Sequence, residues 1–302
     1  MTSTGRRSRP SRRVVLGAAL AVAAGAGVLA HPARPEREAP VPGPDGKAAL
    51  PEPPAPTPSG ASAGPPFQPS FPRSGLVTNE YAFRHPDAPD ARVDPHWTVT
   101  SGSLFGQGGS GWSGVPDGLS PDPASRLRTG SAVLRVVTRR TNFGDVTVGG
   151  RFHLHPPGST ARTPATAWDG GHLLLRYRSP QELYAFSFSR RDGAVAIKRK
   201  APRTGSGEGV YTTLTQATSL FGYETYRHVA AQAVTTASRS VVLRLWVAGR
   251  LILQAEDTTP GRLAGPGAVG VRGDNTELLF QNFSAVQSGG AAPRSLRAGR
   301  MA

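Results

Sequence analysis

The sequence predicts an all-β fold, an antiparallel sandwich of about 210 residues, and three observations support this. Short apolar runs rich in β-branched and aromatic residues recur roughly every 8 to 15 residues. Gly, Asp, Asn and Pro separate these runs, as turns require. Almost no stretch repeats its apolar residues with a helical period, so no helix is predicted. Many short strands joined by turns are typical of a two-sheet sandwich.

Twelve strands are predicted, each from an apolar run that ends at a turn signal. They cover residues 97–100, 103–106, 132–138, 146–155, 172–178, 183–191, 195–200, 226–235, 241–247, 251–256, 268–272 and 277–286. Two connections carry hairpin signals, Asp192-Gly193 and Ala248-Gly249-Arg250.

Residues 1–30 have the pattern of a signal peptide. Five arginines lie in the first 13 residues, a run of apolar and small residues follows from 14 to 30, and Val28-Leu29-Ala30 is a small-residue cleavage site. Ser11-Arg12-Arg13-Val14-Val15-Leu16 resembles the twin-arginine translocation signal. The resemblance implies export of a folded domain, to the extracellular space or the cell wall. An uncleaved membrane anchor is the alternative.

The composition divides the rest of the chain into three parts. Residues 31–75 are rich in Pro, Ala, Gly and Ser and are expected to form a disordered linker, because they cannot bury enough apolar surface. Residues 76–286 form the predicted sandwich domain. Residues 287–302 are small and basic, and a disordered tail is expected there.

The absence of cysteine and the strong positive charge restrict the function classes. Without cysteine the chain has no disulfides, thiolate metal sites or thiol nucleophile. The formal net charge of +15 favours anionic partners such as wall polymers or acidic polysaccharides. The alternative is that the genome uses Arg in place of Lys throughout, so that the positive charge is spread over every face of the protein and marks no binding surface. Nucleic acid is not expected as a partner, since the basic residues show no interleaved aromatic pattern.

Several segments resemble concanavalin A-like lectin/glucanase domains, in the style of laminin-G and keto-disaccharide-hydrolase-like domains. They are the run from Trp97 to Phe105, Tyr226-Arg227-His228-Val229, the hairpin from Leu243 to Ile252, and Gly267 to Asp274 leading into Leu279-Phe280-Gln281-Asn282-Phe283. The resemblance covers the domain and implies a jelly roll of two curved sheets, with glycans usually bound on the concave face. It implies no single activity, because that class contains lectins, glycosidases, lyases and adhesion modules.

The hairpin of residues 172–191 offers the best candidate binding surface. Strand alternation places His172, Arg176 and Arg178 on one face, and Leu173, Leu175 and Tyr177 on the other. Arg binds carboxylate and sulfate groups bidentately, so the first face suits an anionic sugar chain. An ordinary solvated sheet face is the alternative. Asp169 flanks this face, and Tyr184 on the partner strand completes the candidate set.

Catalysis lacks a recognisable motif. Glycoside hydrolysis needs two carboxylates across the scissile bond, and the laminarinase-like Glu-x-Asp-x-x-Glu pattern is absent; Asp169 is the first candidate among the scattered acids. A lyase would need a base and a neutralising cation. His172, Arg176, Tyr177 and Tyr184 are of suitable types, but the expected lyase motifs are absent.

Two sets of residues are candidates for metal binding. His153 and His155 share a strand face, as two imidazole ligands would, but no third ligand is identifiable. Calcium is therefore favoured over zinc, because related sandwiches tie their first strand to their last through oxygen ligands. The calcium candidates are Asn79, Glu80, Asp274, Asn275 and Asn282, whose other interpretation is turn and strand-end hydrogen bonding.

The four tryptophans divide by context. Trp97 and Trp246 lie in strand patterns and are expected in the core, whereas Trp112 and Trp168 lie among Gly, Ser and Asp, where a ring is free to stack on a sugar. The sequence therefore predicts a secreted, monomeric, non-catalytic binder of a polysaccharide or wall glycan. Its predicted contacts are Trp112, Trp168, Asp169, His172, Arg176 and Tyr184. A glycoside hydrolase or polysaccharide lyase, or a structural or adhesion module, are the alternatives.

Overall fold

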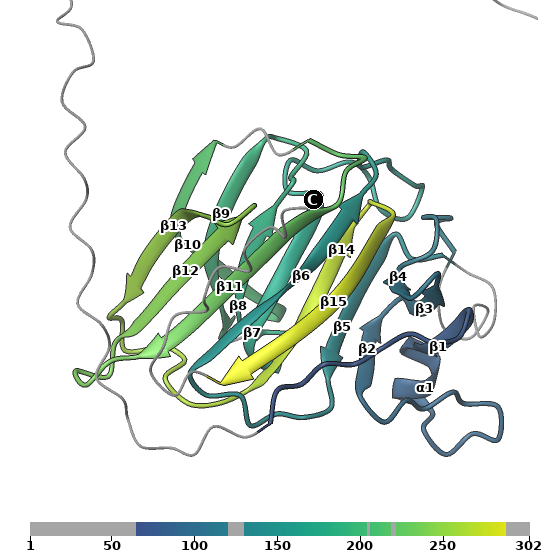
Figure 1. Cartoon of the computed structure of the whole chain (residues 1–302), viewed down its shortest axis with the longest axis horizontal. Helices are drawn as coiled ribbons and strands as arrows, with labels where there is room; N and C mark the ends of the chain where they lie inside the picture. The colour runs from purple at the N-terminus through teal and green to yellow at the C-terminus, as the bar shows by residue number, and fades with distance from the viewer. Residues whose placement is uncertain (1–64, 120–129, 204–205, 219–221, 288–302) are drawn as a thin grey trace, which may run out of the picture. The chain divides into compact units, whose positions relative to one another are not determined.

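The structure is a computed structural model that describes residues 65–119, 130–203, 206–218 and 222–287. The predicted signal peptide, most of the predicted linker and all but the first residue of the predicted tail lie outside the described residues. The described residues form two antiparallel sheets packed as a sandwich, which confirms the predicted fold (Figure 1).

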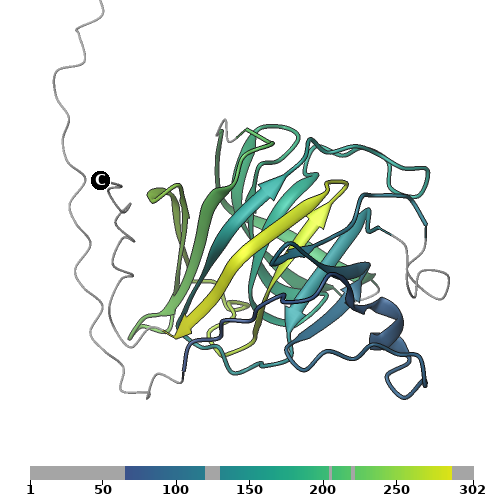
Figure 2. The same cartoon turned by 45° about the vertical axis from the view of Figure 1, so that its right-hand side comes forward.

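One sheet has eight strands and the other has seven. In spatial order, the eight-stranded sheet contains β1 (Gly75–Asn79), β3 (Ser103–Gln107), β4 (Ser110–Trp112), β15 (Leu278–Gln287), β6 (Val146–Leu154), β11 (Arg227–Thr235), β12 (Val241–Val247) and β13 (Arg250–Asp257). The seven-stranded sheet contains β10 (Ser206–Thr218), β9 (Ala194–Arg203), β8 (Glu182–Phe188), β7 (Gly170–Ser179), β14 (Ala268–Asp274), β5 (Val133–Thr138) and β2 (Trp97–Ser101). Figure 2 shows the same two sheets in an oblique view.

The core fills the space between the two sheets. Along β12 burial alternates residue by residue, so that Val241, Leu243, Leu245 and Val247 point inward. A smaller apolar cluster lies on the opposite face of the seven-stranded sheet, and its members are Val137, Leu174, Tyr177, Leu183, Ala185 and Ala268. Trp97 is fully buried, as the sequence predicts.

Each of the twelve predicted strands has a counterpart, and three strands and one helix escaped prediction. Strand β10 lies at the edge of its sheet and is rich in Thr and Gly, so it has no long apolar run to reveal it. Helix α1 (Glu80–Arg84) has only five residues, too few to show a period, and begins where the Asn79 side chain accepts a hydrogen bond from the Ala82 amide at 3.0 Å. Within the described residues, no helix is long enough to cross a membrane.

Packing begins earlier than residue 76, where the domain was expected to start. Phe67 pairs with Ala285 of β15 through two backbone hydrogen bonds of 2.9 Å. Phe71 is buried, and its ring stacks on Trp97 with 6.3 Å between centroids. The end of the predicted linker is therefore part of the core. Phe67 and Phe71 were not predicted as core residues because they lie among prolines.

Candidate functional site

The face predicted for the β7–β8 hairpin is interrupted at Arg176. This residue has a positive φ of 50°, and the pairing of β7 with β8 shifts register between Leu175 and Ser179. Such a bulge turns the following side chains to the other face. Arg176 therefore points inward instead of sharing the face of His172, and Tyr177 joins the outer apolar cluster. The predicted alternation is wrong from this residue onward.

Arg176 is fully buried and links the two sheets. Its guanidinium group donates hydrogen bonds to Asp145 at 2.9 Å, to the Thr235 hydroxyl at 2.9 Å and to the Leu263 carbonyl at 2.8 Å. Burial lowers the pKa of Arg176, and the carboxylate of Asp145 opposes that shift. These contacts give Arg176 a structural role, and its side chain is not exposed to a ligand.

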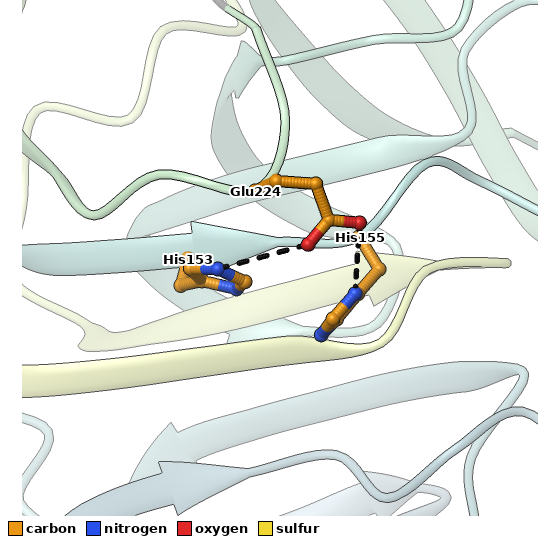
Figure 3. Close-up of side chains that lie close together, drawn as sticks. All are labelled: His153, His155 and Glu224. Atoms are coloured by element: carbon orange, nitrogen blue, oxygen red, sulfur yellow. Dashed lines mark hydrogen bonds and ion pairs between the residues drawn. The ribbon is translucent and has the colours of Figure 1, made fainter.

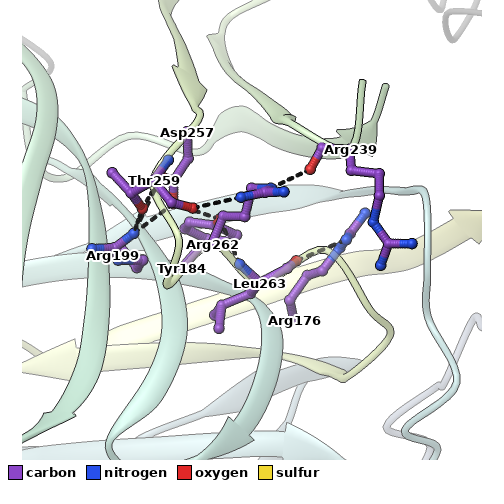
Figure 4. A network of polar contacts seen from close by, with 8 residues as sticks. All are labelled: Arg176, Tyr184, Arg199, Arg239, Asp257, Thr259, Arg262 and Leu263. Carbon is purple, nitrogen blue, oxygen red and sulfur yellow. Dashed lines mark hydrogen bonds and ion pairs between the residues drawn. The ribbon is translucent and has the colours of Figure 1, made fainter. Parts of the chain in front are cut away.

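Tyr184 lies beside this arginine in the same interior network (Figure 4). Its hydroxyl donates to Asp257 at 2.8 Å and accepts from the Leu263 amide at 3.0 Å. Burial raises the pKa of Tyr184, so the phenol stays a donor. Burial also disfavours the Asp257 carboxylate, but hydrogen bonds from Thr259 and Tyr184 outweigh it and lower the pKa of Asp257. Tyr184 therefore holds the loop at Leu263 and is not open to solvent.

His172 is also buried, on the outer side of the seven-stranded sheet. Its Nδ1 atom lies 2.8 Å from the Ser187 hydroxyl, and its Nε2 atom lies 3.0 Å from Asp274. Burial lowers the pKa of His172, although Asp274 opposes this shift. Burial works against ionisation of Asp274 as well, but Arg272 and His172 lower its pKa. Burial therefore favours the uncharged form of this imidazole, which has no exposure to solvent that a ligand could use.

Asp169 is the hydrogen-bonding centre of the loops at one end of the sandwich. Only 2% of it is exposed. Its carboxylate accepts from the Thr166 amide at 2.9 Å, the Thr166 hydroxyl at 2.6 Å, Arg191 at 3.0 Å and the Asn275 side-chain amide at 3.1 Å. With these acceptor positions occupied, Asp169 positions its neighbours and does not face a ligand.

Trp168, the next residue along the turn, is 53% exposed. The backbone around it is fixed by two backbone hydrogen bonds. The Asp192 amide donates to the Ala167 carbonyl at 3.1 Å, and the Arg191 amide donates to the Asp169 carbonyl at 2.8 Å. We call residues 166–169, 190–193 and 275–277 the loop rim. Trp168 is the large aromatic side chain that the loop rim presents to solvent.

Trp112, on β4, contacts the loop rim from the eight-stranded sheet. Its indole Nε1 donates to Glu277 at 2.8 Å, and its ring packs on Phe105 with 5.6 Å between centroids. The ring is partly buried. Of the six predicted contact residues, the loop rim therefore contains Trp168 and Asp169 and contacts Trp112, whereas His172, Arg176 and Tyr184 are buried elsewhere.

Four of the five calcium candidates are engaged in other contacts. Asn79 caps α1, and Glu80 forms an ion pair with Arg84. Asp274 lies between two basic groups, with Arg272 at 2.8 Å and His172 at 3.0 Å. Asn275 donates to Asp169, and Asn282 is exposed with a positive φ of 50°. A carboxylate already neutralised in this way fits calcium poorly. Calcium binding stays a prediction, which the binding assay below tests.

The structure adds a third member, Glu224, to the pair of histidines that the sequence singled out as possible metal ligands. His153 on β6 and His155 just after it are joined by Glu224, which lies in the loop before β11 (Figure 3). Nothing in the sequence connects Glu224 with the histidines, because it lies 69 residues beyond His155. The pairing of β11 with β6 brings them together.

A cavity of about 290 Å³ lies apart from the loop rim. It is lined by residues of α1 and β2, including Ala82, Phe83 and Trp97, and by Arg139, which follows β5. None of the six predicted contact residues lines it.

Comparison with known proteins gives a likeness of fold only. No protein-family model and no curated protein matches the chain. Similar solved structures include a carbohydrate binding module from Bacillus subtilis, with 13% identity and a TM-score of 0.43 over 63% of this chain and 94% of that one. The potassium-bound carbohydrate recognition domain of Emp46p has 12% identity and a TM-score of 0.42 over 65% of this chain and 89% of its own. A β-glucanase from Bacillus licheniformis has 10% identity and a TM-score of 0.45 over 74% of this chain and 99% of its own.

The matches have identities of 10 to 13% and TM-scores below 0.5. The function of this chain is therefore argued from its own residues.

Proposed function

We propose that this domain binds a polysaccharide outside the cell, without chemistry, at the loop rim. Trp168 is the platform on which a sugar ring stacks. The observation that carries the proposal is the exposure of this indole on a turn that is fixed by hydrogen bonds. A large apolar ring held in water is unfavourable for an isolated domain, and a rigid platform loses little entropy when it binds.

The strength of such a contact can be estimated. A pyranose face stacked on the indole removes roughly 60 Å² of apolar surface from water, which contributes about 1.5 kcal/mol, or about tenfold in affinity. Arg191 and Asp192 lie in the same loops with side chains 34% and 31% exposed, and offer polar groups beside the ring. The net charge of +15 favours a polymer that carries carboxylate or sulfate groups.

Binding is favoured over catalysis by the state of Asp169. A carboxylate that acts as acid, base or nucleophile must reach the scissile bond. Asp169 is buried and already accepts hydrogen bonds from three other residues. Its place in the loop rim supports a role in holding Trp168.

The proposal is tested by binding of the full chain to an array of neutral and anionic polysaccharides, with and without calcium. We expect saturable binding to an anionic glycan, weakened about tenfold or more by Trp168→Ala. Trp246→Ala is the matched control, because Trp246 is half-buried on β12, away from the loop rim. Absence of binding to every glycan, or equal loss in the two variants, would overturn the proposal.

A further inference from the structure

Two imidazoles and a carboxylate converge on the surface where β6 ends. His153 and His155 are two residues apart and project from the same side of the strand. The loop that carries Glu224 is held against this strand, because the Glu224 amide donates to the Leu154 carbonyl at 2.9 Å. The three side chains therefore come from two segments whose relative position is fixed by backbone hydrogen bonds.

The distances fit one small cation. The Nδ1 atom of His155 lies 3.0 Å from Glu224 Oε1, and the Nε2 atom of His153 lies 3.9 Å from Glu224 Oε2 (Figure 3). One nitrogen or oxygen atom from each residue lies within 4.8 Å of the others. Ligands about 2.0 to 2.2 Å from a tetrahedral zinc ion are about 3.4 Å from one another, so small side-chain rotations would complete the site.

The surroundings orient the rings as in known metal sites. The other nitrogen of His155, Nε2, lies 3.7 Å from the carboxylate of Glu277. Glu277 is itself held by the Trp112 indole at 2.8 Å. A histidine that ligates a metal commonly directs its second ring nitrogen toward a carboxylate. The Nδ1 atom of His153 is buried, which leaves its Nε2 atom, facing Glu224, to reach an ion.

We propose that His153 Nε2, His155 Nδ1 and the Glu224 carboxylate bind a divalent ion of the zinc class. Two imidazoles with one carboxylate are a donor set that zinc favours, whereas calcium and magnesium prefer oxygen alone. The side chains of Glu224 and His155 are 54% and 39% exposed, so a fourth coordination position faces solvent. The site stands on its own observations and does not depend on glycan binding at the loop rim.

The test is isothermal titration of zinc chloride into the full chain, purified without a polyhistidine tag and stripped with a chelator. We expect one saturable site per chain. Glu224→Gln keeps the size and hydrogen-bonding capacity of an exposed side chain but removes its charge, and should weaken binding at least tenfold. His155→Gln should do the same. Calcium chloride should give no saturable heat at this site.

His228→Ala is the matched control. His228 lies on β11, is exposed and belongs to no described group of metal-binding side chains. It should leave zinc binding unchanged. The proposal is overturned if the wild-type chain shows no saturable site, if both Glu224→Gln and His155→Gln bind zinc as the wild type does, or if His228→Ala weakens binding as much as they do. Circular dichroism of each variant checks that the fold is kept.

Discussion

Trp168 and Asp169 are neighbours in the chain, yet one is 53% exposed and the other 2%. The sequence marked both as ligand contacts, Trp168 because it lies among Gly, Ser and Asp, and Asp169 because it flanks the predicted face of the hairpin. Their hydrogen-bond partners show that the two residues have different roles. Asp169 receives hydrogen bonds from three other residues, whereas Trp168 presents its ring to water. A sequence shows which side chains could bind, but burial depends on loops that are distant in the chain.

We predict that Asp169→Asn destabilises the domain. The side-chain amide of Asn cannot replace both the ion pair with Arg191 and the hydrogen bond from Asn275. Its NH₂ group would also face N–H groups that need an acceptor. Because Arg191 is partly solvated, we expect a loss of about 2 kcal/mol in the free energy of unfolding, measured by urea denaturation. Asp87→Asn, at an exposed site, should change it by less than about 0.5 kcal/mol. An unchanged midpoint for Asp169→Asn would contradict this role.

The buried histidine makes stability depend on pH. The pKa of His172 is lowered in the folded state, mainly by burial. The unfolded chain therefore binds a proton more readily, and the stability that this group contributes is present above about pH 6.5 and is lost as the pH falls below it. We expect the urea midpoint to drop between pH 7.5 and pH 5.5, and His172→Gln to flatten that drop.

His228 provides the comparison for this pH dependence. Burial also lowers the pKa of His228, but this residue is largely exposed, so water weakens the effect. His228→Gln should therefore leave most of the pH dependence in place. A pH profile unchanged by His172→Gln would show that the group is not responsible.

At the scale of elements, the strands were predictable and their irregularities were not. Alternation along β12 runs without a break, so its pattern and its burial agree. Strand β7 has an equally regular sequence pattern, but its bulge at Arg176 reverses the faces beyond that residue. At the bulge Arg176 contacts Asp145, Thr235 and Leu263, which are distant in the chain. Local pattern does not contain that information.

The bulge predicts different effects for two arginines on one strand. Arg176→Ala removes a buried cation, leaves the Leu263 carbonyl without its donor and leaves Asp145 without its ion pair, so we expect a loss of about 3 kcal/mol. Arg178→Ala removes a half-exposed ion pair with Glu182 and should cost about 0.5 kcal/mol. Urea denaturation measures both. Similar losses for the two variants would mean that they share one face, as strict alternation predicts.

At the scale of the whole domain, the core closes over the residues that precede β1. The sandwich class followed from the spacing of apolar runs, because every two-sheet fold needs that spacing. The start of the domain did not, since Phe67 and Phe71 lie in a Pro-rich segment. The candidate metal site also depends on contacts between segments that are distant in the chain. Glu224 meets His153 and His155 only because β11 pairs with β6.

We predict that Phe71→Ala is strongly destabilising. Its ring packs between Trp97 and Phe280, and its removal leaves a cavity that costs about 3 kcal/mol. Phe83→Ala is the control, since that ring is 51% exposed and should cost less than about 1 kcal/mol. Thermal or urea unfolding of the full chain measures the loss of stability in both variants. A silent Phe71→Ala would place residues 65–74 outside the core.

The central claim is that the loop rim is the glycan-binding surface, and side-chain footprinting of the full chain with its polysaccharide tests it most directly. Modification of Trp168, Arg191 and neighbouring residues should fall when the glycan is added, while Trp246 on the face of the eight-stranded sheet should react as before. Protection confined to Trp246 or to other residues on the sheet faces, with Trp168 unchanged, would contradict the account.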